Sequence, residues 1–160
     1  METEKKYILD ANCFIEPWNK FYSYSFFAHF WDEFVRRSCD KNIIFVQQEV
    51  YDEIFKKEDA LKSWIEKQDL KIAETDLRLT KSATNINNRF PKLVKEVKGR
   101  SMADPFVIAF AKQESATVVT LEHKGTEDKP KIPYVCNELG VRCIDLFDFI
   151  KEVGVKFRVH

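Results

Sequence analysis

Short apolar runs alternate with longer helical patterns along this chain. The runs predict buried strands at 6–9, 43–46, 71–73, 117–120 and 141–144. Helices are predicted at 26–35, 47–57, 58–67, 102–113, 133–139 and 145–153, and at 76–99 with a break near Pro91. Such alternation is typical of a parallel sheet covered by helices on both faces. The sequence therefore predicts an α/β fold, a three-layer α/β/α sandwich with a mainly parallel central sheet.

Composition excludes several other classes of protein. The 160 residues are 44% hydrophobic and include 14 Phe, which excludes disorder and fits one domain spanning residues 1–160. Only 4 Gly and 5 Pro argue against an all-β fold with many turns. No apolar run approaches the roughly 18 residues of a membrane span, and no signal-peptide pattern is visible. Because the four cysteines form no CxxC motif, we expect free thiols and a cytoplasmic protein.

Acidic side chains lie where several predicted strands end. Asp10 follows the first strand, and Glu49 and Glu53 lie in the first turns of the helix after the second. Glu122 follows the strand at 117–120, and Asp104 opens the helix that leads into that strand. Ligands of open α/β sheets bind beyond the carboxyl ends of the strands. We therefore expect these carboxylates to converge on one edge of the sheet.

Each acid also has a structural interpretation. Asp104, before Pro105, is a good helix N-cap, and Asp10 is able to begin an Asx-turn. Glu53 and Glu122 fit a solvated helix and a polar loop at 121–131. Together, however, unpaired carboxylates repel one another, and a hard divalent cation relieves that repulsion. Mg²⁺ or Mn²⁺ held in this way typically serves phosphoryl chemistry.

Helical geometry separates Glu49 from Glu53. Val50 and Ile54 define the core direction of the helix, at about 100° per residue. Glu53 then points about 80° from that direction and Glu49 about 120° from it. We therefore predict that Glu53 is a metal ligand and that Glu49 has at most a supporting role.

Four short motifs hold the predicted acids. They are Ile8-Leu9-Asp10-Ala11-Asn12, Val50-x-x-Glu53-Ile54, Ala103-Asp104-Pro105-x-Val107-Ile108-Ala109 and Thr120-x-Glu122. In this order, between Tyr7 and about Val153, they resemble the PIN-domain nucleases, in particular a compact bacterial and archaeal PIN-like subfamily. Many members of that family carry Asp where this chain has Glu122.

The resemblance implies a PIN-like fold and an endoribonuclease that depends on Mg²⁺ or Mn²⁺ and cleaves single-stranded RNA. Such proteins are commonly the toxin of a VapC-type toxin–antitoxin pair. It further implies an antitoxin partner and a homodimer. The implied catalytic and metal-binding residues are Asp10, Glu53, Asp104 and Glu122, with Asn12, Thr120 and Glu49 in supporting roles.

Positive charge is concentrated just before Asp104, although the chain as a whole has no net charge. Residues 78–100 contain seven basic side chains and one acid, Glu96. This pattern favours a phosphate-binding face over an ordinary solvated helix. The candidate RNA-phosphate-binding residues are Arg89, Lys92, Lys95, Lys98 and Arg100.

Three other functions compete with the ribonuclease. The first is a catalytically inactive PIN-like module that binds RNA or a protein, and the second is a DNA nuclease. The third is a phosphatase or phosphotransferase with Asp10 as nucleophile. That activity usually needs a second acid where this chain has Asn12, and no Gly-rich phosphate loop is present.

Overall fold

Five parallel strands form the centre of the molecule. The computed structural model describes residues 5–57, 59–94 and 102–154. The sheet has the strand order β3-β2-β1-β4-β5, and every pairing is parallel. The strands are β1 (Tyr7–Leu9), β2 (Ile44–Gln47), β3 (Lys71–Ala73), β4 (Thr117–Val119) and β5 (Cys143–Ile144). The prediction of a mainly parallel sheet is confirmed.

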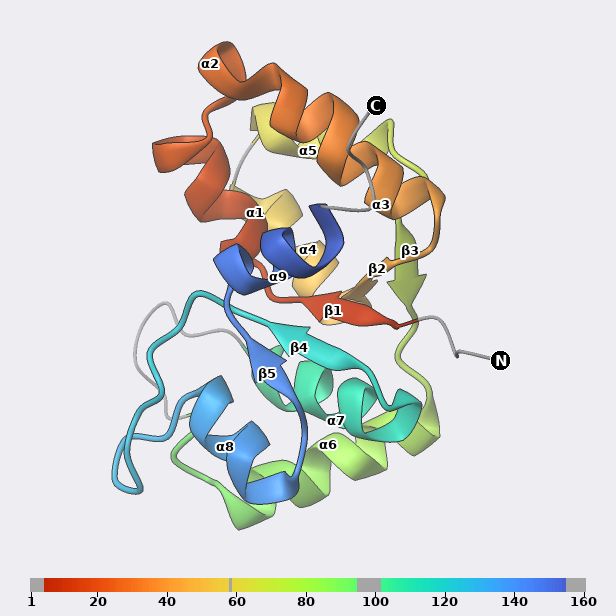
Figure 1. The fold of residues 1–160 in the computed structure, drawn as a ribbon. Coiled ribbons are helices and arrows are strands. Elements are labelled where there is room, and N and C mark those ends of the chain that lie inside the picture. The colour runs from red at the N-terminus through yellow and green to blue at the C-terminus, as the bar shows by residue number, and fades with distance from the viewer. Residues whose placement is uncertain (1–4, 58, 95–101, 155–160) are drawn as a thin grey trace.

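Helices cover both faces of this sheet. Figure 1 shows one face covered by α6 (Leu77–Arg89), α7 (Asp104–Glu114) and α8 (Ile132–Leu139). The other face carries α1 (Asn12–Glu16), α2 (Tyr24–His29), α3 (Arg36–Asp40), α4 (Gln48–Lys57), α5 (Asp59–Glu66) and α9 (Leu146–Gly154). Right-handed crossovers explain this division, because the chain first adds β2 and β3 on one side of β1 and later adds β4 and β5 on the other. The result is the predicted three-layer α/β/α sandwich.

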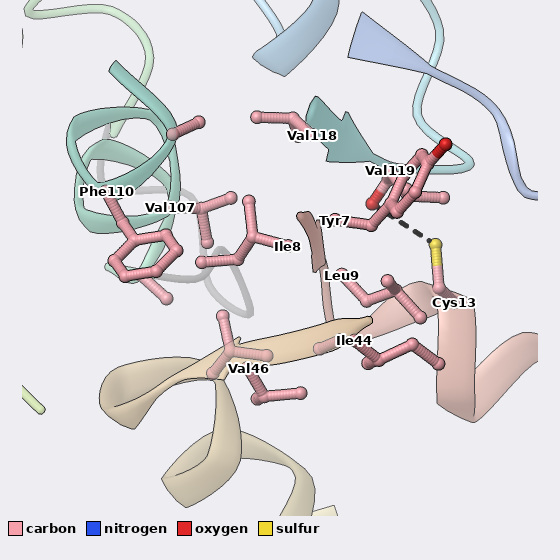
Figure 2. Close-up of a cluster of buried hydrophobic side chains, with 14 of the residues drawn as sticks. Tyr7, Ile8, Leu9, Cys13, Ile44, Val46, Val107, Phe110, Val118 and Val119 are labelled. Carbon is pink, nitrogen blue, oxygen red and sulfur yellow. Dashed lines mark hydrogen bonds between the residues drawn. The ribbon is translucent and has the colours of Figure 1, made fainter. Parts of the chain in front are cut away.

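The central strands are buried on both faces. Ile8 and Val118 have no exposed surface, and Figure 2 shows both in the same buried cluster as Val107 of α7. This double burial explains why these strands are continuous apolar runs in the sequence. On the opposite face, the Cys13 thiol of α1 donates to the Val119 carbonyl at 3.3 Å (Figure 2). All four cysteines are free, as predicted.

The region before β2 is more helical than the sequence predicts. Helix α1 begins at Asn12, and a π-helical segment follows at Pro17–Phe21. The predicted helix at 26–35 is interrupted at Phe27, whose φ of −127° and ψ of 39° are not helical. Of the aromatic side chains in this segment, Trp31 is fully buried, whereas Phe27 is 44% exposed.

Other boundaries differ by a few residues. Helix α6 ends at Arg89, close to the break predicted near Pro91, and residues 91–94 form a turn rather than a helix. The rest of the predicted helix, 95–99, lies outside the described residues. Strand β4 ends one residue before Thr120. Within the described ranges, no helix has the length and apolarity needed to cross a membrane.

Candidate metal centre

Three carboxylates meet at the carboxyl edge of the sheet. Asp10, Asp104 and Glu122 each place one oxygen within 4.8 Å of the other two. Asp10 directly follows β1, Asp104 is the first residue of α7, and Glu122 follows β4. Since Leu9 pairs with Val119, the chain leaves β1 and β4 side by side. The fold thus brings Asp104 and Glu122 together with Asp10, which precedes Glu122 by more than a hundred residues.

Thr120 links two of these acids. Its Oγ1 hydroxyl donates to Asp10 Oδ2 at 3.1 Å and accepts the backbone N–H of Glu122 at 3.1 Å. The N–H of Ala11 donates to the other oxygen of Asp10 at 2.8 Å. Both oxygens of Asp10 are therefore held in place before any ligand arrives. In an Asx-turn the Asp10 side chain would accept the N–H of the residue two positions later. Here it accepts the N–H of Ala11, the next residue, so the Asx-turn interpretation is wrong.

Asn12 joins the two strand ends from the other side. Its Oδ1 accepts the N–H of Leu121 at 3.1 Å, and its Nδ2 donates to Thr120 Oγ1 at 3.5 Å. Asn12 and Thr120 thus lie directly behind the acids. Their supporting roles in the site stay a prediction.

Asp104 does not cap its helix. The N-cap of α7 is Ala103, while Asp104 is inside the first turn and only 7% exposed. The structural interpretation as an N-cap is therefore wrong. Helix capping therefore does not explain why a carboxyl group is buried at this position.

Glu122 is held by the start of α8. Its Oε2 accepts the backbone N–H of Ile132, the first residue of that helix, at 3.1 Å. The positive end of the helix dipole favours a carboxylate here. Glu122 is therefore half-buried and oriented, rather than one more charge in a polar loop.

Glu53 and Glu49 lie in different surroundings. Glu53 is half-buried on α4, with its Oε2 atom buried, and its negative charge contributes to raising the pKa of both Asp10 and Asp104. It is close to the cluster but outside the set of oxygens within 4.8 Å. Glu49 instead accepts a hydrogen bond from Thr75 Oγ1 at 3.2 Å, beyond the end of β3.

Gln47 and Thr75 form a further hydrogen-bonded network at this edge of the sheet, which the sequence does not predict. Gln47 is fully buried, donates to Thr75 Oγ1 at 2.7 Å and accepts the N–H of Glu49 at 2.7 Å. This network supports the first turn of α4, the helix that carries Glu53. No sequence pattern marks Thr75, because its partners come from other elements.

Burial and mutual repulsion disfavour the charged forms of the acids. Burial, then the charge of Glu122, raises the pKa of Asp10 to about 7, although the bonds from Ala11 and Thr120 oppose the change. Burial, followed by the charges of Asp10, Glu122 and Glu53, raises the pKa of Asp104 well above its usual range. Lys131 acts in the opposite direction and lowers the pKa of Asp104. Strongly perturbed carboxyl groups of this kind cluster at functional sites.

The cluster fits a hard divalent cation. Mg²⁺ binds oxygen ligands at about 2.1 Å, so two of its ligands are at most about 4.2 Å apart. The observed limit of 4.8 Å requires side-chain movements of only about half an ångström. Carboxylates are also the ligands that Mg²⁺ and Mn²⁺ prefer. Asp10, Asp104 and Glu122 are therefore able to hold such an ion.

The predicted phosphate-binding residues are only partly described. Arg89 and Lys92 line an open cavity of about 360 Å³ that also contains Glu127, Asp128 and Glu138. Lys92 pairs with Asp128 at 3.6 Å. The remaining candidates, Lys95, Lys98 and Arg100, lie outside the described residues, so this face stays a prediction.

The fold and the acidic centre together define an α/β sandwich with a candidate metal site at the carboxyl edge of a parallel sheet. A family model described as "Domain of unknown function (DUF4411)" matches residues 7–157, and the chain belongs to this family. No curated protein matches the sequence.

One similar solved structure supports the fold. It is described as VapBC2 from Rickettsia felis bound to a DNA fragment from their promoter. The match covers 87% of this chain and 97% of that chain, with 15% identity and a TM-score of 0.54. At this identity the likeness concerns architecture alone. The architecture agrees with a PIN-like three-layer sandwich.

Proposed function

We propose that this protein is an endoribonuclease that depends on Mg²⁺ or Mn²⁺ and cleaves single-stranded RNA. The observation that carries the proposal is the convergence of Asp10, Asp104 and Glu122 on one edge of the sheet. Three buried or half-buried acids are costly to keep together unless a cation balances them. The likeness in fold to a chain of a VapBC complex supports the same assignment.

In the proposed hydrolysis of a phosphodiester, the acids would bind the metal, and Thr120 and Asn12 would orient Asp10. Asp10, Asp104, Glu122 and Glu53 would hold the metal, which orients a water molecule, lowers its pKa and neutralises phosphate charge. The water oxygen forms a bond to phosphorus while the bond from phosphorus to one ribose oxygen breaks. The attacking water loses a proton to solvent or a carboxylate, and the leaving ribose oxygen gains one. Thr120 and Asn12 keep Asp10 oriented throughout.

The same likeness supports a proposal about the biological role. We propose that the protein is the toxin of a toxin–antitoxin pair, with an antitoxin protein as partner and a homodimer as its assembly. Exposed aromatic side chains support a protein partner, because patches of this kind commonly mark interaction sites. They are Tyr24, Phe26, Phe27 and Phe147, of which Phe26 is 84% exposed.

A cleavage assay with acid variants tests the enzymatic proposal. Asp10→Asn and Asp104→Asn should each lower the rate on a labelled single-stranded RNA by orders of magnitude, and EDTA should abolish cleavage by the wild type. Asp40→Asn is the matched control, because Asp40 is exposed at the end of α3 and is not one of the clustered acids. Near-normal cleavage by either buried-acid variant would contradict the proposal.

The same assay ranks the two glutamates of α4. Glu53→Gln should weaken both Mn²⁺ binding and cleavage, because the charge of Glu53 acts on Asp10 and Asp104. Glu49→Gln should have a mild effect, since Glu49 bonds to Thr75 instead. A larger loss for Glu49→Gln would show that the ligand set is wrong. Preferential cleavage of single-stranded DNA would favour the DNA nuclease, and metal-independent RNA binding without cleavage would favour the inactive module.

A further inference from the structure

The segment from Glu122 to Ile132 is a short hairpin that returns to the acidic centre. Gly125 and Pro130 form an antiparallel bridge, and the N–H of Thr126 donates to the Lys129 carbonyl at 3.1 Å. Because Ile132 then donates its N–H to Glu122, the preceding residue, Lys131, lies beside the cluster. The sequence does not single out Lys131, which is one of several lysines in a polar loop.

Close packing fixes the position of Lys131. Gly125 has a φ of +78°, and a Cβ atom there would lie 2.6 Å from the backbone nitrogen of Lys131 and 2.9 Å from its Cγ. The hairpin therefore packs closely against the backbone and the aliphatic part of the Lys131 side chain. Lys131 is half-buried in consequence, whereas Lys129 on the same hairpin is exposed.

The charge of Lys131 acts on Asp104 although the two side chains form no ion pair. It lowers the pKa of Asp104, against the effects of burial and of three other acids. Within the described residues, Lys131 forms no ion pair, in contrast to Lys92, which pairs with Asp128. A half-buried ammonium that has no carboxylate of its own at a functional edge is available to a ligand.

An RNA phosphate that approaches this edge meets an excess of negative charge. One divalent cation balances two carboxylates, yet Asp10, Asp104, Glu122 and Glu53 are all close enough to influence one another. Further negative charge develops on the phosphate oxygens as water attacks. A cation placed in advance stabilises that charge most effectively where water is excluded.

We propose that Lys131 binds a non-bridging oxygen of the phosphate to be cleaved and is a catalytic residue of this site. The inference rests on the proposed ribonuclease function and adds the cation that contacts the substrate. The ammonium donates hydrogen bonds and keeps its protons throughout, so it contributes charge and position and takes no part in proton transfer.

Three lysine variants test this role. Lys131→Gln removes the charge, Lys131→Arg retains it, and Lys129→Gln removes an exposed charge from the same hairpin. For each variant, single-turnover cleavage of a labelled single-stranded RNA is measured with Mn²⁺, Mn²⁺ affinity is measured by calorimetry, and thermal unfolding is followed.

Lys131→Gln should cleave about 10- to 100-fold more slowly, the effect of losing a hydrogen bond to a charged group. Lys131→Arg should recover most of that rate, and Lys129→Gln should stay within about twofold of the wild type.

The outcomes separate this role from the proposed function. Unchanged metal affinity and melting temperature in Lys131→Gln, together with the slower rate, support substrate binding. If the wild type cleaves RNA and Lys131→Gln cleaves as fast, the role of Lys131 is wrong while the nuclease stands. A rate loss that comes with weaker Mn²⁺ binding or a lower melting temperature, or that Arg does not rescue, shows a structural role and overturns the inference. A wild type that cleaves no RNA overturns both.

Discussion

Asp10 is a carboxyl group that folding buries among other acids, so its protonation is coupled to stability. Its pKa rises from 3.8 to about 7 in the folded protein, first through burial and then through the charge of Glu122. Between about pH 4 and 7 the folded protein therefore binds a proton that the unfolded chain has already lost. In the absence of metal, the free energy of unfolding should fall as the pH rises through this range. At about 1.4 kcal/mol per pKa unit, the fall amounts to a few kcal/mol at most.

Urea unfolding in EDTA at pH 5 and pH 8 measures this dependence. Asp10→Asn is the informative variant, because it has no charge to bury and should be more stable than the wild type at pH 8. At pH 5 the two proteins should be closer in stability. Equal pH dependence in both proteins would show that Asp10 is not the group that titrates.

Thr120 permits a test of orientation without any change in charge. Its hydroxyl is the hydrogen-bond donor to Asp10 Oδ2, and the side chain is only 2% exposed. Thr120→Val keeps the shape and removes this bond, so Mn²⁺ should bind roughly 10-fold more weakly, as is typical when a ligand loses its supporting partner. Thr120→Ser retains the hydroxyl and should bind Mn²⁺ like the wild type. Calorimetric titration of both variants decides the point, and equal affinities would remove Thr120 from the site.

At the scale of the elements, the hairpin before α8 depends on one glycine. A Cβ at Gly125 would lie 2.6 Å from the backbone of both Lys129 and Lys131, whereas a Cβ at Gly140 would meet nothing within 4 Å. Both residues have positive φ, at +78° and +69°, so alanine costs about 1–2 kcal/mol of backbone strain at either position. Gly125→Ala must in addition displace the hairpin. It should therefore destabilise more than Gly140→Ala and slow RNA cleavage, while Gly140→Ala should cleave normally. Denaturant unfolding and the cleavage assay on the two variants provide the comparison, and slow cleavage by Gly140→Ala alone would contradict it.

The sequence predicts the strands well and the early helices poorly. Runs such as 43–46 and 117–120 agree with β2 and β4 to within one residue, because buried parallel strands need uninterrupted apolar side chains. The segment Asn12–Phe21 was not predicted as helical, since Pro17 reads as a break. In the structure Pro17 has helical backbone angles and begins a π-helical segment directly after α1.

The sequence likewise predicts some parts of the candidate site and not others. Strand ends and motif order predict Asp10 and Asp104, because both follow from local pattern and from the direction of parallel strands. Contacts between a loop and a distant element cannot be predicted in this way, because no local sequence pattern marks them. The bond from Ile132 to Glu122 and the approach of Lys131 depend on the hairpin, and Gln47–Thr75 depends on the pairing of β2 with β3.

At the scale of the whole molecule, the acids join distant parts of the fold. Asp10 and Glu122 follow adjacent strands, Asp104 opens a helix on one face, and Glu53 lies on a helix of the other face. A cation held among them would bind only the folded protein, so it should stabilise the entire domain. At 100 times its dissociation constant the gain is about 2.7 kcal/mol. The melting temperature should therefore rise in millimolar Mg²⁺ or Mn²⁺ for the wild type and stay constant for Asp104→Asn. A wild-type melting temperature that ignores both ions would argue against a preformed centre.

The hydrogen bond between Thr120 and Asp10 spans 110 residues of sequence. Ribosomes add roughly 5–20 residues per second, so Asp10 is polymerised roughly 5–20 seconds before Thr120. During that interval β1 has no β4 to pair with, and the hairpin that orients Glu122 does not yet exist. For a protein of the proposed function, the growing chain is therefore harmless to the messenger RNA that encodes it until translation has passed Ile132.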